Sequence, residues 1–355
     1  MPKTNRQNFM TDKQNIFGFL LTELKELVTE LDLPKFTANQ MADWMYKKHV
    51  QSIDEMTNLS KKARELLNEK YFVGLTSPSN VQESVDGTKK YLYPTNQSGK
   101  FIESAYIPDG ERATLCVSTQ IGCKMNCLFC MTGKQGFQGN LTAGEIINQI
   151  QSLPEFEKLT NIVYMGMGEP LDNVEATLGS LEILTSDWGY AWSPKRITVS
   201  TIGVIPAMKQ FLEKSNAHLA VSLHSPFDDE RLKIMPIQRT YPITKVVEEI
   251  KKWDFGKQRR VSFEYIMFKG VNDTPRHAKE LLRLLDGVKC RINLIRFHNI
   301  PDTPLEGTAY DDIVEFQNML KARGMTVTIR ASRGEDIFAA CGMLSTKEQQ
   351  NPTKA

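Results

Sequence analysis

The chain contains 355 residues with a formal net charge of +2; 41% of the residues are hydrophobic and 24% are charged. No apolar run approaches the roughly 20 residues that a membrane span requires, so the composition indicates a soluble protein. A charge this close to neutral neither requires nor excludes a nucleic-acid partner, and any RNA site must come from local patches. One large domain with a smaller appendage is expected, because single cores stop growing near about 250–300 residues.

Cysteine usage and the N-terminus predict a cytoplasmic protein. Six cysteines in 355 residues are too sparse for a disulfide framework. Residues 1–7 lack the apolar run of a secretory signal. We therefore expect reduced thiols that are available to bind metal, and no membrane partner.

Residues 1–85 are predicted to form a helical accessory domain. Apolar spacing typical of amphipathic helices runs through 17–33 and again through 36–46. A small helical core explains these positions without any further function. The basic residues of this region are candidates for contacts with RNA phosphates, and a solvated surface is the alternative. They are Lys47, Lys48, Lys61, Lys62 and Arg64.

Residues 86–110 are predicted to form a connecting β-hairpin. Alternating apolar residues flank 96–99, which has the composition of a turn. Glu103 then lies on the second strand, which leads toward Cys116.

Residues 111–345 alternate short β-branched runs with amphipathic helical stretches, as parallel βα units do. The predicted strands are 113–118, 161–165, 196–200, 218–222, 260–267, 291–297 and 326–330. The predicted helices are 142–151, 176–185, 205–214, 243–253, 275–285 and 311–323. Such a series forms an open doubly wound sheet or a full or partial barrel, and in both the chemistry gathers at the carboxyl ends of the strands. Residues 346–355 are predicted to be a polar, disordered tail.

The most informative motif is CxxxCxxC, formed by Cys123, Cys127 and Cys130. Three thiolates on one short loop can ligate three irons of a 4Fe-4S cluster and leave the fourth iron open. The spacing resembles the signature of radical S-adenosylmethionine (SAM) enzymes, in which SAM fills that vacancy; Phe129 is also usual there. The alternative is a structural zinc site, which needs four ligands, and only Cys116 lies near enough in sequence to be the fourth.

Four further segments follow predicted strands, and each has an ordinary structural explanation as well. They are MGMGEP (165–170), STIG (200–203), SLHS (222–225) and RFHN (296–299). Gly166 and Gly168 form a tight turn or let backbone approach a ligand. Ser200 and Ser222 are equally suited to be helix N-caps, and His224 to pack in a turn. Because all four segments are expected at the same rim as the cysteine loop, a shared site is the stronger interpretation.

Between Glu103 and Cys341 the chain resembles the radical-SAM adenine-C2 RNA methyltransferases, which methylate an adenine of 23S ribosomal RNA and, in some members, the adenine next to the anticodon of tRNA. The matching segments are RATLC (112–116), GCKMNCLFC (122–130), MGMGEP (165–170), STIG (200–203), SLH (222–224) and DIFAACG (336–342). The resemblance implies an α/β fold, a radical-SAM partial (β/α)6 barrel with a small helical RNA-contacting domain. It also implies a 4Fe-4S cluster, two SAM molecules per turnover, and an electron donor such as a flavodoxin or ferredoxin system.

The same resemblance implies roles for three residues outside the cluster loop. Adenine C2 is a poor nucleophile, so methylation there needs a radical route. Cys341 is implied to carry the methyl group as S-methylcysteine and to join the base covalently. Glu103 is implied to accept the C2 proton, and Cys116 to attack the Cys341 sulfur, which releases the product as a transient disulfide forms. Without the resemblance, Cys341 is interpreted as a buried helix cysteine; Cys290 matches no role and is predicted to be a core residue.

The remaining implied residues bind SAM: Gly168, Glu169, Ser200, Ser222, Leu223, His224 and Asn299. Glu and Asn side chains suit an ammonium and a carboxylate, while backbone and hydroxyl groups suit ribose and adenine. Around Asn299 the chain reads RFHNIPD (296–302), where many relatives have a Pro-Trp-Asn-Pro type of sequence.

Three alternatives stay open. A sister group methylates adenine C8 and confers antibiotic resistance; Pro170 favours the C2 group, because the resistance group commonly has alanine there. A non-catalytic zinc- or cluster-binding RNA protein would use the cysteine loop as a structural element. A different radical-SAM enzyme, such as an activase or an RNA methylthiolating enzyme, would share the cluster without the chemistry of Cys341.

Overall fold

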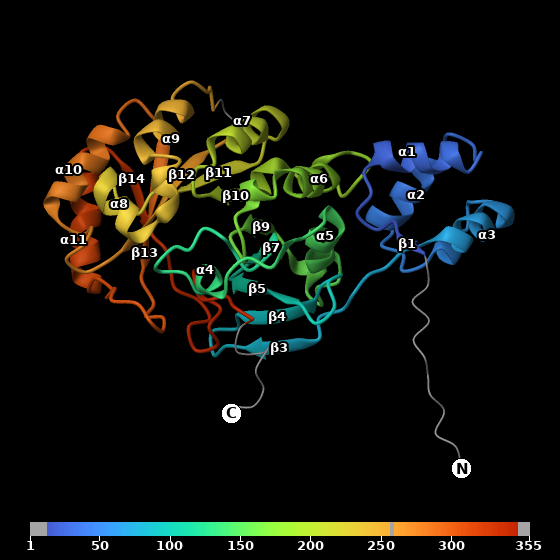
Figure 1. The fold of residues 1–355 in the computed structure, drawn as a ribbon, viewed down its shortest axis with the longest axis horizontal. Helices are drawn as coiled ribbons and strands as arrows, with labels where there is room; N and C mark the ends of the chain where they lie inside the picture. Colours follow the sequence, from blue (N-terminus) through green and yellow to red (C-terminus); the bar gives the residue numbers. More distant parts are fainter. Residues whose placement is uncertain (1–12, 256–258, 347–355) are drawn as a thin grey trace, which may run out of the picture. The chain divides into compact units, whose positions relative to one another are not determined.

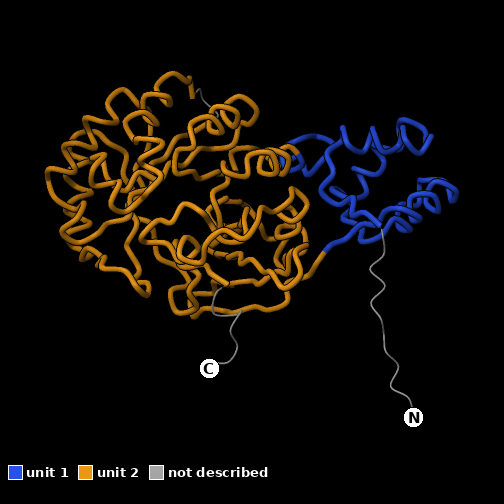
Figure 2. Tube along the Cα trace, viewed as in Figure 1, with its two compact units in different colours: residues 1–75, 183–191 blue, residues 76–182, 192–355 orange. Residues whose placement is uncertain are grey.

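The computed structural model describes residues 13–255 and 259–346, which divide into two compact units (Figures 1 and 2). The smaller unit comprises the chain up to Leu75 together with Ile183–Ala191, and the larger one comprises Thr76–Glu182 together with the chain from Trp192 onward. The predicted tail, 346–355, lies outside the described residues except for Thr346. No helix within these described ranges is long and apolar enough to cross a membrane.

The smaller unit is mainly helical, and the helices predicted at 17–33 and 36–46 are confirmed. Its elements are β1 (Gln14–Asn15), α1 (Leu21–Glu30), α2 (Thr37–Tyr46), η1 (Ile53–Glu55), α3 (Lys61–Lys70) and β2 (Tyr71–Phe72). Strands β1 and β2 pair in parallel, which joins the two ends of the N-terminal segment.

Tyr46, the last residue of α2, shows why the remote segment 183–191 belongs to this unit. Tyr46 is fully buried, and its hydroxyl donates to the carbonyl of Phe19 at 2.7 Å. The rings of Trp188 and Tyr190 each lie 5.9 Å from the Tyr46 ring, centroid to centroid. Such aromatic pairs stabilise a core beyond their buried area, so the segment completes the core of the smaller unit.

The larger unit is built on a ten-stranded sheet with the order β14-β13-β12-β11-β10-β9-β6-β5-β4-β3. Its parallel strands are β6 (Arg112–Cys116), β9 (Asn161–Tyr164), β10 (Ile197–Thr201), β11 (His218–Ser222), β12 (Val261–Met267), β13 (Cys290–Arg296) and β14 (Thr326–Ile329). All seven strands predicted for the core are confirmed. Because the sheet has two edges, at β14 and β3, it is an open partial barrel and not a closed one.

Helices surround these strands (Figure 1). The six predicted ones are confirmed as α5 (Ala143–Gln151), α6 (Val174–Thr185), α7 (Ile205–Lys214), α9 (Ile243–Ile250), α10 (Pro275–Leu284) and α11 (Tyr310–Lys321). The short helices α4 (Met131–Gln135) and α8 (Asp228–Ile234) were not expected, because they are too brief to show a period. Helix α5 begins at a capping box: the hydroxyl of Thr142 accepts the N–H of Glu145 at 3.1 Å, and the Glu145 carboxylate accepts the N–H of Thr142 at 2.9 Å.

The predicted hairpin is continuous with the main sheet. β4 (Lys89–Pro94) and β5 (Phe101–Asp109) pair antiparallel, and β3 (Asn80–Glu83) extends the sheet beyond β4. On its other side β5 pairs with β6, where Ala105 lies opposite Cys116. The hairpin therefore places Glu103 one strand away from the barrel.

Candidate active site

A cavity of about 420 Å³ opens at the carboxyl ends of the parallel strands, where α/β folds of this kind bind their ligands. Ten of the predicted site residues line it: Cys116, Cys123, Cys127, Cys130, Gly168, Glu169, Ser200, Ser222, His224 and Cys341. These residues come from six separate segments of the sequence, so the fold brings together what the motifs only suggested. Three predicted residues, Glu103, Leu223 and Asn299, are not part of the lining.

The cysteine loop is held in place at both ends. Gly122 has φ +73°, and a Cβ atom there would lie 1.7 Å from the carbonyl oxygen of Gly136, so only glycine fits. The N–H of Met131 donates to the carbonyl of Gly342 at 2.8 Å. The loop is thereby tied to the segment that carries Cys341.

Burial keeps the three thiols of the loop protonated unless a metal replaces the protons. All three are free. Burial, together with the charge of neighbouring thiols, raises the pKa of Cys123 to about 12 and puts that of Cys127 well above its usual value. A cationic iron core offsets both effects, because it replaces the thiol protons. Within the described ranges no three His, Cys, Asp or Glu side chains converge on one metal ion, which is compatible with a cluster whose irons each take a single thiolate.

Glu169 presents a buried carboxylate to the cavity. One oxygen accepts the N–H of Leu171 at 3.1 Å and the other accepts the N–H of Ile202 at 3.0 Å. Burial raises the pKa of Glu169 to about 7. The preceding Gly168 has φ +98°, and a Cβ there would lie 2.5 Å from Gln120. The segment therefore brings bare backbone and an acidic group close to any ligand in the cavity.

His224 is a neutral histidine that links the end of β11 to the cysteine loop. The N–H of Ile266 donates to its Nδ1 at 3.0 Å, so the ring hydrogen lies on Nε2. Burial lowers the pKa of His224 to about 3. Its ring meets the edge of Phe129 with centroids 4.8 Å apart. His224 also has φ +56°, a rare conformation for a residue with a side chain and one that is typical of functional sites.

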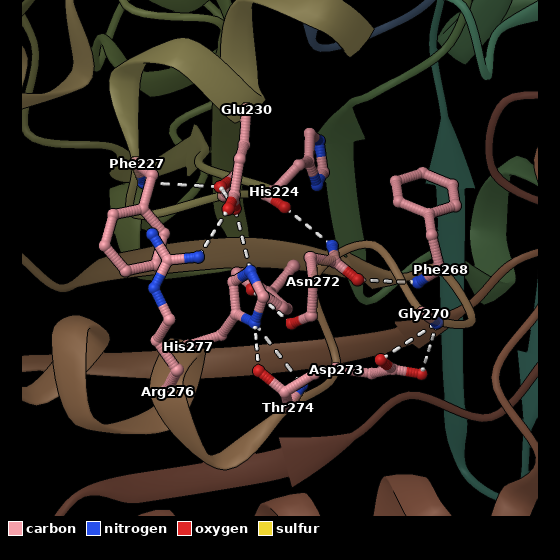
Figure 3. A network of polar contacts seen from close by, with 12 residues as sticks. His224, Phe227, Glu230, Phe268, Gly270, Asn272, Asp273, Thr274, Arg276 and His277 are labelled. Carbon is pink, nitrogen blue, oxygen red and sulfur yellow. Dashed lines mark hydrogen bonds and ion pairs between the residues drawn. The ribbon is translucent and has the colours of Figure 1, made fainter.

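Figure 3 shows the polar network that fixes this turn. The side-chain amide of Asn272 is fully buried; it donates to the carbonyl of His224 at 2.6 Å and accepts the N–H of Phe268 at 2.7 Å. Nearby, Glu230 pairs with Arg276 at 3.0 Å and with His277 at 2.7 Å. These contacts join the segment after β11, with helix α8, to the segment after β12, with helix α10.

Arg231 holds the backbone of the segment Ser222–His224 in place. Its guanidinium is fully buried and donates to the carbonyls of Ser222 at 2.9 Å, Leu223 at 3.0 Å and Ile202 at 2.8 Å. Leu223 is fully buried and does not line the cavity. The hydrogen bond from Arg231 to its carbonyl fixes its backbone. The half-buried hydroxyl of Ser222 remains on the lining.

Cys116 and Cys341 open on the same cavity although they lie 225 residues apart in the sequence. Cys116 ends β6, and burial raises its pKa to about 12. Cys341 is exposed and lies in a turn after β14, so the alternative of a buried helix cysteine is wrong. Cys290 lies at the start of β13 and is only half-buried, so it is not the core residue that was predicted.

Two predicted residues lie away from the cavity. Glu103 is fully buried on β5, where its carboxylate pairs with Lys90 at 3.2 Å and accepts the N–H of Ser345 at 3.0 Å. Asn299 is exposed, and its neighbour His298 lines the cavity in its place. The roles assigned to Glu103 and Asn299 stay predictions.

Several charged residues at the site were missed from the sequence, among them Arg231, Glu264 and Arg330. Glu264 had a signal, because it interrupts the otherwise apolar strand VSFEYIM (261–267). Arg231 and Arg330 had none, since an arginine in a polar stretch is normally exposed.

Two family models match separate parts of the chain. Residues 14–73 match the ribosomal RNA large subunit methyltransferase N-terminal domain, and residues 117–285 match the radical SAM superfamily. The second match contains the cysteine loop and the segments around Glu169, Ser200 and His224.

Relatives match over almost the whole chain. The probable dual-specificity RNA methyltransferase RlmN of Bacteroides thetaiotaomicron is 59% identical over 98% of this chain and 100% of its own length. The dual-specificity RNA methyltransferase RlmN of Syntrophus aciditrophicus is 42% identical over 94% of this chain and 97% of its own. The crystal structure of a radical SAM methyltransferase from Sphaerobacter thermophilus superimposes with a TM-score of 0.86 at 38% identity, over 93% of this chain and 99% of that one. The chain is therefore an RNA methyltransferase that uses a 4Fe-4S cluster and SAM, and it belongs to the RlmN family within the radical SAM superfamily.

Proposed function

We propose that the enzyme methylates C2 of an adenine in 23S rRNA and, in some tRNAs, the adenine next to the anticodon. The observation that carries this proposal is the meeting of Cys116 and Cys341 in one cavity with the cysteine loop. A radical SAM enzyme that only generated a radical would need the loop alone. Two further thiols at the same place suit a reaction in which the protein itself carries the methyl group.

The cavity residues divide between the two cofactors. Cys123, Cys127 and Cys130 are the proposed cluster ligands. Gly168, Glu169, Ser200, Ser222, Leu223, His224 and Asn299 are the proposed SAM-binding residues. When bound, the cofactors supply a methyl group and a carbon-centred radical inside the cavity.

The protein's own thiols then handle the methyl group. The thiol of Cys341 accepts it and loses its proton. The methyl carbon then gives one hydrogen atom to the radical and becomes bonded to adenine C2 while still attached to the Cys341 sulfur. When C2 loses its proton, the unpaired electron of the adduct would pass back to the redox system that supplied it. In the release step the thiolate of Cys116 attacks that sulfur. A disulfide forms between the two cysteines, the bond from sulfur to the methylene carbon breaks, and its electron pair leaves with the adenine, where protonation completes the new methyl group.

Glu103 is the proposed acceptor of the C2 proton, and it needs a movement of the chain to act. Its carboxylate is engaged by Lys90 and by the backbone of Ser345, a few residues beyond Cys341. We propose that the segment around Ser345 shifts when RNA binds and uncovers Glu103. The lysines of the smaller unit are the proposed phosphate contacts, and a flavodoxin or ferredoxin system is the proposed cytoplasmic electron donor.

The affinity for SAM is expected to fall as the solution becomes acidic. The pKa of Glu169 is about 7, and only the carboxylate form attracts the SAM ammonium. The dissociation constant at pH 6 should therefore be roughly ten times that at pH 8, from the protonated fractions at the two pH values. Equilibrium binding to the cluster-loaded enzyme measures it. Glu169→Gln should bind SAM weakly at both pH values; an equally steep pH dependence in that variant would assign the effect to another group.

The methylated position is tested on RNA from a strain that lacks the gene for this chain. Nucleoside mass spectrometry, with 2- and 8-methyladenosine separated, is applied to ribosomal and transfer fractions. We expect 2-methyladenosine to be lost from both fractions and restored by the wild-type gene. Loss of 8-methyladenosine instead would establish the C8 activity, and loss from rRNA alone would exclude the tRNA part of the proposal.

A further inference from the structure

A buried charged network lies beside the cavity on β12, β13 and the end of β14. Glu264 is only 4% exposed. One of its oxygens accepts from the Ser262 hydroxyl at 3.0 Å and from the Asn293 amide at 2.7 Å, and the other accepts from Arg330 at 3.3 Å. The Thr328 hydroxyl in turn donates to Asn293 at 2.6 Å. A carboxylate with this many partners is firmly fixed, and it fixes Arg330 with it.

This network holds Arg330 on the wall of the cavity. Arg330 lines the cavity together with Cys116 and Cys341. The Nη1 atom that binds Glu264 also donates to the sulfur of Met165 at 3.4 Å, and Met165 packs against the cluster of buried residues around Cys116. The backbone N–H of Arg330 donates to the carbonyl of Leu294 at 2.9 Å, which ties the residue to β13.

Besides Arg330, a backbone hydrogen bond from Met165 favours a negative sulfur at Cys116; the side chains around that sulfur do not. The side chains that form its buried cluster are apolar: Ala105, Val163 and Ala339, with Ile107, Met165 and Ile337 at the edge. Of the other charged groups on the cavity, Arg333 is already paired with Asp109 at 2.8 Å, and Arg112 donates to Asn161 at 3.1 Å. Cys341 and Arg330 are the charged or ionisable groups that act on the Cys116 thiol, Cys341 against ionisation and Arg330 in favour of it.

The release step requires that negative sulfur. With Arg330 in place the pKa of Cys116 is about 12, so only a small fraction of the thiol is ionised at neutral pH, and that fraction is the nucleophile. Without the guanidinium the fraction would be smaller still. A fixed guanidinium close by favours the thiolate, as a cation does beside other reactive cysteines.

We propose that Arg330 is a positioning residue for product release, which holds its positive charge near Cys116 and so increases the fraction of that thiol present as the thiolate that attacks Cys341. Glu264 opposes this action, because it neutralises part of the same charge. The place of Arg330 in release rests on the proposed function; its effect on the Cys116 thiol does not.

The effect on the thiol is measured without SAM or RNA. The cluster-loaded enzyme, kept anaerobic and carrying Cys341→Ala so that Cys116 is followed alone, is treated with iodoacetamide between pH 7 and 10. Peptide mass spectrometry gives the alkylation rate of Cys116. We expect Arg330→Met to lower the rate at pH 8 by about tenfold, equivalent to about one pKa unit. Glu264→Gln should raise it, and Arg333→Met, the matched loss of an already paired arginine, should leave it unchanged.

A folding defect is separated from the charge effect by the double variant Glu264→Gln/Arg330→Met. The double variant leaves no unpaired buried charge, so it should fold as well as the enzyme that carries Cys341→Ala alone. Its Cys116 should still be alkylated slowly. An unchanged alkylation rate in both Arg330→Met and the double variant would overturn the inference, and so would a decrease in Arg333→Met of the same size.

The role in release is measured with Cys341 restored. With SAM, reductant and RNA, Arg330→Met should accumulate covalently attached RNA, as Cys116→Ala should. Attached RNA in Cys116→Ala with none in Arg330→Met would overturn the role of Arg330 in release. If neither variant accumulates it while alkylation is slowed, the proposed function fails and the effect of Arg330 on the thiol stands.

Discussion

Replacing Cys116 with alanine is expected to stop the reaction with RNA covalently bound to the protein. Cys116 shares the cavity with Cys341, and in the proposed mechanism its thiolate breaks the bond between the Cys341 sulfur and the transferred carbon. Without it, the first turnover proceeds and the second cannot start. A denaturing gel of the anaerobic reaction with SAM, reductant and an RNA fragment should show most of the active enzyme shifted to higher mass, with product formation reduced by several orders of magnitude.

Two control variants define this result. Cys116→Ala/Cys341→Ala should form no adduct, because the attachment point is gone. Cys290→Ala, which removes a half-buried cysteine outside the cavity, should turn over like the wild type. Release of methylated RNA by Cys116→Ala at the normal rate would show that another group resolves the adduct.

Replacing Cys127 with alanine is expected to abolish the cluster and with it every later step. Cys127 is buried in the middle of the cysteine loop, close to Cys123 and Cys130, and two thiolates cannot hold three irons. The variant should be colourless, contain little iron, and form neither 5'-deoxyadenosine nor methylated RNA. Iron analysis, the visible spectrum and chromatography of the SAM products measure these losses.

The matched control is again Cys290→Ala, which should keep the brown colour and the SAM cleavage of the wild type. Circular dichroism should show that Cys127→Ala is folded, since the loop is one small part of a large unit. A Cys127→Ala enzyme that still cleaves SAM would contradict the assignment of the ligands. So would wild-type protein that holds zinc in the loop and no iron.

The parallel sheet could be predicted because its strands are signalled locally. Strands buried on both faces appear as short apolar runs, and the bounds of strand β11, His218–Ser222, were predicted to the residue. So were the bounds of helix α7, Ile205–Lys214. The cysteine loop could be predicted for the same reason, since its three thiols lie within eight residues of sequence, 123–130. The meeting of the four strand-end segments at one rim followed from the rule for parallel sheets.

Contacts between remote segments could not be predicted in this way. The hydrogen bond from the backbone of Ser345 to the Glu103 carboxylate joins residues 242 positions apart. No local sequence pattern predicts it. The ion pair of Glu264 with Arg330 and the carbonyl contacts of Arg231 likewise exist only once several strands are side by side. Segment 183–191 belongs to the smaller unit through its contacts with Tyr46, although its sequence position lies inside the barrel.

The central claim is that Cys341 carries the transferred carbon, and peptide mapping of the RNA adduct tests it most directly. Cys116→Ala is reacted with RNA and with SAM bearing a fully deuterated methyl group, then digested with protease and nuclease. The account predicts one modified peptide, containing Cys341, in which a methylene carbon with two deuterium atoms joins the sulfur to C2 of adenine. An adduct at any other residue, attachment at C8, or a methylated RNA product that arises with no modification of Cys341 would contradict it.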